Sequence, residues 1–240
     1  MFSIRYFLFV GLSAAIAVMP AANAHAQNNV AAGPLAWPDE CSKAAAPDAK
    51  AGMLQRMPVL NSNSLTAAQQ DAVKKISSGP RGCIFGPFLV LLRSPELLNR
   101  VQNVGVYLRF QSKVPQKLRE FAILIAGRQE QSPYVWYIHE PIALRNGVAL
   151  ATIQAIAAQQ RPAAMSADET VIYDMLDELH KDHEVRPDTY ATAVARLGEG
   201  GVVDIVGIDG YFRLLAEELN MAQTAVPADV QPPFPAPWQH

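Results

Sequence analysis

The sequence predicts an all-α fold, a helical bundle in which one helical hairpin carries a candidate site. Helix-start signals recur along the chain, apolar residues between them repeat at intervals of three and four, and no pair of alternating strands joined by a tight turn is visible. The 240 residues, half of them hydrophobic, suffice for one domain of ordinary size. A net charge of −2 without a basic cluster argues against nucleic-acid binding.

Residues 1–26 have the pattern of a secretory signal peptide. Arg5 precedes the apolar run FLFVGLSAAIAVMP, and Ala24 and Ala26 supply the small residues that a signal peptidase requires. We expect cleavage between Ala26 and Gln27, and therefore a periplasmic or secreted protein. An uncleaved anchor helix is the alternative, although the run is short for a membrane span. No later segment is apolar for long enough to suggest a span after cleavage.

Composition divides the rest of the chain into an extended arm (27–60), a helical domain (61–225) and a Pro-rich tail (226–240). The two cysteines, Cys41 and Cys83, would meet an oxidising compartment, which favours a disulfide between the arm and the domain. Such a bond would contribute roughly 4 kcal/mol by closing the loop in the unfolded chain. Two free structural thiols are the alternative, and the spacing is not that of a redox-cycling CxxC pair.

The first helices are predicted from their start signals. Thr66 and Gln69 form a capping box for a helix that ends near Gly79. Ser94-Pro95 is a helix start with Pro at the first helical position, and this helix extends to about Phe110. Two further helices are expected over 115–129 and 133–146, the second ending at Asn146-Gly147.

The second half of the domain continues in the same way. Ser166 and Glu169 form another capping box, followed by an apolar stripe at helical spacing: Ile172, Met175, Leu176 and Leu179. Asp188 is the expected cap of a helix ending at Gly198, and a long apolar helix follows over 202–220. Asp204 and Asp209 interrupt that helix, so each requires a partner if buried, either in a pocket or at a subunit interface.

The helices 115–129 and 133–146 are joined by a very short turn near Gln131, which makes them antiparallel neighbours. Glu120 lies eleven residues before that turn and His139 eight after it, so their heights along the hairpin differ by only about 4–5 Å. A carboxylate and an imidazole at matching heights can orient one tautomer and move a proton. In the alternative interpretation, His139 is a satisfied core residue and Glu120 a surface charge beside Arg119.

Four segments in order resemble the carboxymuconolactone decarboxylase family, which includes the alkylhydroperoxidase D (AhpD) proteins: GPFLVLLRSPEL (86–97), VPQKLREFAILIAGR (114–128), YVWYIHEPIAL (134–144) and GEGGVVDIVGIDGYF (198–212). The resemblance covers roughly residues 50–235. It implies an AhpD-like all-α fold and a homo-oligomer, commonly a trimer or hexamer.

The resemblance also implies roles for single residues. Glu120 matches the family's relay glutamate and His139 its histidine, while Tyr134 falls where some members carry a further relay histidine. The CxxC pair of peroxidase members would occupy positions 132 and 135, which are Ser132 and Val135 here. Thiol peroxidase chemistry needs a thiolate and a resolving thiol, so an AhpD-like antioxidant peroxidase is disfavoured. Val135 also replaces the glutamate of many decarboxylase-like members.

These observations predict a decarboxylase-like lyase or proton-transfer enzyme that acts on a small oxygenated or lactone-like acid without metal or organic cofactor. His139, Glu120 and Tyr134 are the expected catalytic residues, and Arg128, Trp136 and Tyr211 the expected substrate contacts, with Arg128 holding a carboxylate. A non-catalytic helical oligomer that binds a small ligand or a protein is the alternative. A metal site at His180, His183 and Glu184 is not expected, because no further ligand accompanies them and a solvated face explains them better.

Overall fold

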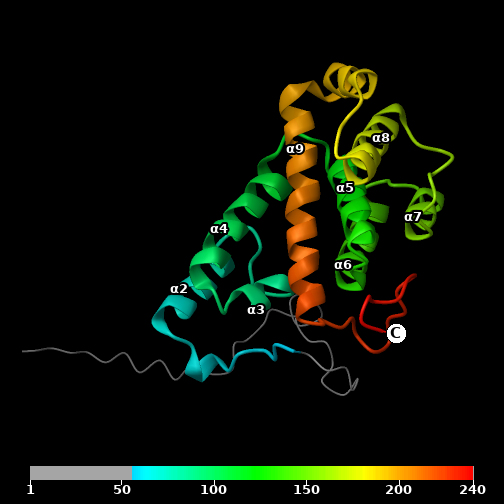
Figure 1. Ribbon diagram of the computed structural model, residues 1–240. Helices are drawn as coiled ribbons and strands as arrows, with labels where there is room; N and C mark the ends of the chain where they lie inside the picture. Colours follow the sequence, from blue (N-terminus) through cyan, green and yellow to red (C-terminus); the bar gives the residue numbers. More distant parts are fainter. Residues whose placement is uncertain (1–55, 240) are drawn as a thin grey trace, which may run out of the picture. The chain divides into compact units, whose positions relative to one another are not determined.

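The computed structural model describes residues 56–239, and this part of the chain is all-α, as predicted (Figure 1). The signal-peptide prediction, the arm up to residue 55 and Cys41 lie outside the described residues. Within them there is no strand, and no helix is long and apolar enough to cross a membrane. The elements are η2 (Ser62–Ser64), α2 (Ala67–Ser78), α3 (Pro87–Leu91), α4 (Pro95–Val106), η3 (Tyr107–Gln111), α5 (Gln116–Gln129), α6 (Pro133–Arg145), α7 (Leu150–Ala157), α8 (Ala167–Asp182) and α9 (Pro187–Met221).

Both predicted capping boxes are present. The Thr66 backbone N–H donates to Gln69 at 2.9 Å, and the Gln69 N–H donates back to the Thr66 hydroxyl at 3.3 Å. Ser166 and Glu169 make the same reciprocal pair at 2.8 and 3.2 Å at the start of α8. Each box satisfies two of the N–H groups that a helix start leaves without an intrahelical acceptor.

The helix boundaries differ from the prediction in four places. The short helices α3 and α7 were not predicted; neither has a side-chain cap, although α3 begins with Pro87 at its first position. The helix that begins at Pro95 changes to a π-helix, η3, for its last five residues. α9 begins at Pro187, with Arg186 rather than Asp188 as the N-cap, because proline fits the first helical position. Gly198 breaks α9 as expected, with φ 71° and ψ 160°.

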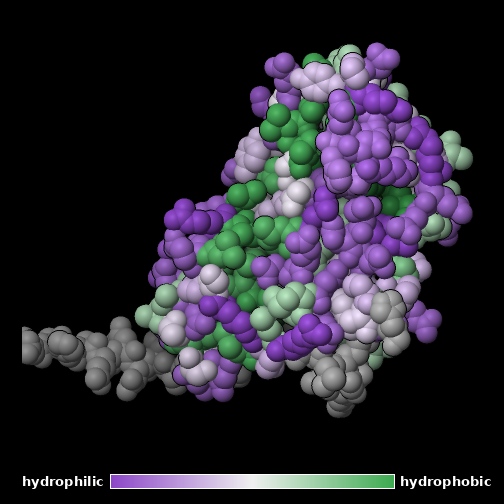
Figure 2. Space-filling view, in the orientation of Figure 1, coloured by the Kyte–Doolittle hydropathy of each residue, from purple (hydrophilic) through white to green (hydrophobic). Residues whose placement is uncertain are grey.

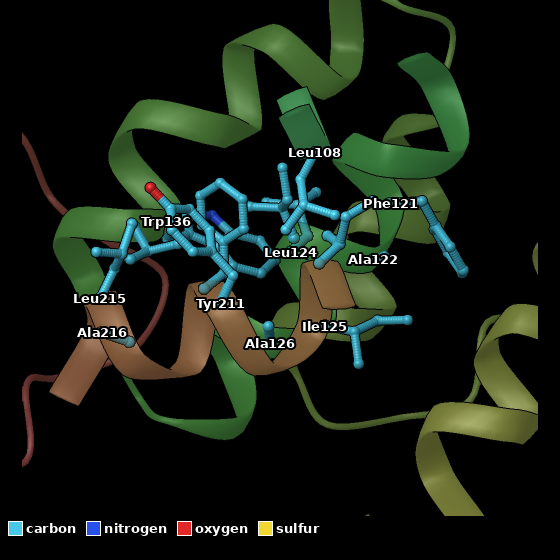
Figure 3. Packing of buried hydrophobic residues seen from close by; sticks show 14 of the residues in the cluster. Leu108, Phe121, Ala122, Leu124, Ile125, Ala126, Trp136, Tyr211, Leu215 and Ala216 are labelled. Atoms are coloured by element: carbon cyan, nitrogen blue, oxygen red, sulfur yellow. The ribbon is translucent and has the colours of Figure 1, made fainter. Parts of the chain in front are cut away.

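α5 lies at the centre of the bundle. It packs against α6, α7, α8 and α9, and its residues from Leu118 to Gly127 are buried except for Arg119. Phe121 and Leu124 of this helix belong to one buried hydrophobic cluster with Tyr211 and Leu215 of α9 (Figure 3). Because α5 is covered on nearly all sides, a polar side chain on it must find its partner inside the protein.

Residues 222–239 contain neither helix nor strand, but they pack against the helices. Phe234 is buried and meets Trp136 of α6 edge to face, with the ring centroids 5.4 Å apart. At the start of this segment, the Ala222 carbonyl accepts a hydrogen bond from the Arg56 backbone N–H at 3.1 Å. The proline-rich stretch expected as a tail therefore covers part of α6, as the red segment in Figure 1 shows.

Candidate functional site

Glu120 and His139 meet inside the α5–α6 hairpin. The turn between the two helices needs only residues 130–132, with Gln131 in the left-handed region at φ 49°. His139 Nδ1 lies 2.7 Å from Glu120 Oε2, and the two side chains are 5% and 4% exposed. The ring of His139 also packs edge to face on Phe212 of α9, at a centroid distance of 4.9 Å.

The surroundings of the pair fix its charge state. Burial alone would raise the pKa of Glu120, but His139, Arg109 and Arg119 more than offset it and hold this pKa below its ordinary value. Burial lowers the pKa of His139, with Arg109 and Arg81 adding to this effect against the opposing influence of Glu120. The pair is therefore a carboxylate and a neutral imidazole at neutral pH. Since a carboxylate only accepts, Nδ1 carries the proton and Nε2 carries the lone pair.

His139 lines a small cavity of about 30 Å³. Its other polar lining comes from Tyr134, Arg81 and Arg109, and the remainder is apolar: Phe85, Pro87, Phe88, Val135, Ile138, Phe212, Leu215 and Leu219. This volume holds one or two water-sized groups. A substrate larger than that must displace side chains at the rim to reach the imidazole.

Arg81 and Arg109 are site residues that sequence reasoning missed. Arg81 lies with its guanidinium 4.5 Å from the Phe88 ring centroid and donates to the Tyr211 hydroxyl at 3.2 Å. Burial lowers the pKa of Arg81 to about 10, an effect that Tyr211 opposes and Arg109 reinforces. Its Nε is buried without an acceptor in the described part of the chain. Two neighbouring cations beside one carboxylate leave the cavity with an excess of positive charge.

Arg109 reaches the cavity from the π-helix η3, which several hydrogen bonds hold in place. Arg119 Nη1 donates to the Arg109 carbonyl at 2.7 Å. Asp204, which the sequence indicated must have a partner if buried, accepts from the Tyr107 hydroxyl at 3.1 Å and from Ser112 Oγ at 2.5 Å. π-helical turns are frequent at functional sites. Arg81 was missed because it lies in a loop, and Arg109 because its turn is a π-helix and not the end of the α-helix that was expected up to about Phe110.

The structure separates the other predicted site residues. Tyr134 is buried in the cavity wall, and burial raises the pKa of its phenol, so it stays a proton donor. Tyr211 acts on the cavity through Arg81. Trp136 and Arg128 do not line this cavity: Trp136 Nε1 donates to Glu140 at 3.1 Å, and Arg128 Nε donates to the Ala157 carbonyl at 2.7 Å.

The two positions where peroxidase members carry their cysteines are both buried. Ser132 is fully buried and its hydroxyl has no hydrogen-bond partner in the described residues. Val135 lines the cavity. Cys83 is buried in the loop before α3, whereas Cys41 lies outside the described residues, so their pairing stays a prediction.

The expectation of a solvated face at His180 is wrong. The His180 side chain is 6% exposed and its Nε2 lies 3.0 Å from both carboxylate oxygens of Asp209, which explains how α9 accommodates that aspartate. His183 and Glu184 are exposed, as expected. Among the residues that the structure describes, no three or more His, Cys, Asp or Glu side chains gather in a way that could hold a metal ion.

Comparison with known proteins identifies the fold. The chain is similar to the crystal structure of a protein of unknown function from Agrobacterium tumefaciens, ATU0492, described as a candidate antioxidant defence protein of the AhpD type. The TM-score is 0.52 at 16% identity, and the match covers 58% of this chain and 96% of the other. No protein-family model and no curated protein matches the sequence. The all-α bundle with its helical hairpin is therefore an AhpD-like fold.

Proposed function

We propose that the protein is a decarboxylase-like proton-transfer enzyme that acts on a small oxygenated or lactone-like acid. The observation that carries the proposal is the 2.7 Å contact between Glu120 and His139, whose ring lines a small cavity. A buried carboxylate that fixes the tautomer of a histidine is a recurrent device of general acid–base catalysis.

Each residue of the site then has a chemical task. His139 Nε2 takes a proton from an acidic C–H of the substrate, and the Glu120 carboxylate stabilises the imidazolium that forms. The electron pair left on the substrate becomes an enolate, whose oxygen is stabilised by Arg81 or Arg109. The imidazolium then returns its proton to carbon. In a decarboxylation, the bond between the α-carbon and the carboxylate breaks, carbon dioxide leaves and the same enolate remains. His139 then delivers a proton taken from solvent to the α-carbon.

The charge of the cavity supports an anionic substrate. Arg81 and Arg109 line the cavity and no carboxylate residue lines it with them, while Glu120, which lies near Arg109, is already bonded to His139. Arginine binds carboxylates through paired N–H donors, and burial strengthens such a contact. For the substrate at His139, these two arginines therefore replace Arg128 as the proposed anchor of the carboxylate.

The alternatives have weaker support. A non-catalytic ligand-binding protein would not need Glu120 and His139 in contact. A thiol peroxidase would need cysteines at positions occupied by Ser132 and Val135. The contact therefore favours proton transfer over both.

Export and self-association are part of the proposal. Export rests on residues 1–26 and is tested by N-terminal sequencing of the mature protein, which should begin at Gln27. Self-association rests on exposed large hydrophobic side chains along two neighbouring elements, α4–η3 (Val104, Phe110) and α9 (Val203, Val206). Figure 2 shows hydrophobic residues gathered over α4 and α9. Surfaces of this kind commonly mark subunit contacts.

The test is hydrogen–deuterium exchange at carbon. The purified protein is incubated in D₂O with a panel of small keto, hydroxy and lactone acids, and ¹H NMR follows both deuterium incorporation and loss of carbon dioxide. His139→Gln and Glu120→Gln should each reduce the rate on the responsive acid by about 10²–10⁴-fold. The matched control is His183→Gln, which changes an exposed histidine and should keep the wild-type rate. Wild-type rates in both site variants would sink the proposal.

A further inference from the structure

We propose that a second cavity, between α5, α7 and α8, binds a small organic carboxylate. The cavity has a volume of about 150 Å³. An engineered protein cavity of roughly this size accepts benzene, so the ligand has on the order of six to ten non-hydrogen atoms. Buried Ile125 and Ile156 supply the apolar wall. The polar part of the wall is larger and includes Arg128, Tyr173, His180, Gln129, Gln159 and Gln160.

Arg128 is the proposed anchor for the carboxylate. Its guanidinium is held in place, because Nε donates to the Ala157 carbonyl at 2.7 Å and the group lies 4.5 Å from the Phe234 ring centroid. Its Nη1 is buried without a hydrogen-bond partner, and no carboxylate of residues 56–239 forms an ion pair with it. A guanidinium N–H group without an acceptor is costly, and a carboxylate is the acceptor that matches its geometry.

The other charged residues of the cavity leave this cation unbalanced. Lys181 and Asp177 form an ion pair at 2.9 Å, so their charges cancel. Asp209 is bonded to His180, which fixes the imidazole to α9 and makes it a rigid part of the wall. The cavity therefore combines one cation with a wall that is apolar at Ile125 and Ile156 and hydrogen-bonding at three glutamines, which suits a short carboxylic acid whose body offers both kinds of contact.

This site is separate from the one at His139. No residue lines both cavities. α5 carries Glu120 and Arg128 eight residues apart, which corresponds to about 12 Å along the helix and a rotation of about 80° around it. The two side chains therefore face different neighbouring helices, and ligand binding at Arg128 does not require the chemistry proposed at Glu120.

The test is a titration of the full protein with acetate, benzoate and inorganic phosphate, followed by the NMR signals of ¹³C-labelled histidine. Benzoate should shift the His180 signal saturably and leave the His139 signal in place. Arg128→Gln should weaken benzoate binding at least tenfold, whereas Arg145→Gln, which changes an exposed arginine at the end of α6, should not. Arg128→Lys keeps the charge and guards against loss of folding, and it should bind benzoate more tightly than Arg128→Gln.

Four results would overturn the proposal. The first is the absence of any saturable His180 shift with acetate or benzoate. The second is unchanged benzoate affinity in Arg128→Gln, and the third is loss of binding in Glu120→Gln, which would place the ligand at the other cavity. Equal affinity for phosphate and benzoate would also contradict it, because the cavity would then select charge alone and not an organic carboxylate. Activity in the exchange assay plays no part in these outcomes, so the two proposals can fail independently.

Discussion

Substitution of Gly105 by alanine tests the packing that positions Arg81. Gly105 is a buried residue of α4, and a Cβ there would overlap the Tyr211 hydroxyl and Arg81 Nη2. Alanine in a helix interior would by itself stabilise the protein by about 0.5–1 kcal/mol. Against this stand overpacking, which costs about 1–3 kcal/mol, and loss of the Arg81–Tyr211 hydrogen bond, which costs about 1 kcal/mol. The expected net result is a loss of about 1–3 kcal/mol.

Urea denaturation followed by circular dichroism measures this loss directly. The matched control is Gly200→Ala in α9, because a Cβ at Gly200 has no neighbour within 4 Å. That variant should be about 0.5–1 kcal/mol more stable than wild type. If Gly105→Ala is as stable as wild type, Tyr211 and Arg81 have room to move apart. The proposal that this contact holds Arg81 at the cavity would then be wrong.

Two further predictions concern charge and assembly. Because burial lowers the pKa of His139, the unfolded chain takes up this proton first, and stability should fall as the pH drops through about 6.5. The lowered pKa of Glu120 adds a second loss in more acidic solution. In His139→Gln, the urea midpoint should change less between pH 7.5 and 5.5 than it does in the wild type. An unchanged dependence on pH would contradict the lowered pKa of His139. Val203→Asp with Val206→Asp should lower the molar mass measured by light scattering, whereas equal masses would remove this face of α9 from any subunit contact.

The sequence alone determined the features that depend on near neighbours in the chain. The capping boxes at Thr66 and Ser166 were predictable because their partners lie three residues away. The meeting of Glu120 and His139 was predictable because a turn of a few residues forces two helices to run side by side, so positions along one helix fix positions along the other. The all-α class follows from the same local signals.

Only the tertiary structure decided which residues from distant segments of the chain come into contact. Arg81 comes from a loop, which has no period, and Arg109 from a π-helix, whose period differs from that of the α-helix expected there, so the sequence did not predict that the two meet at one cavity. His180 of α8 meets Asp209 of α9, and the chain between them contains a loop and the break at Gly198, so no helical spacing relates the two residues. Arg128 shares a helix with Glu120 but is rotated about 80° from it, and only the packing around α5 shows that this rotation leads to a different cavity. Contacts between distant segments depend on how helices pack, and packing is set by the whole core.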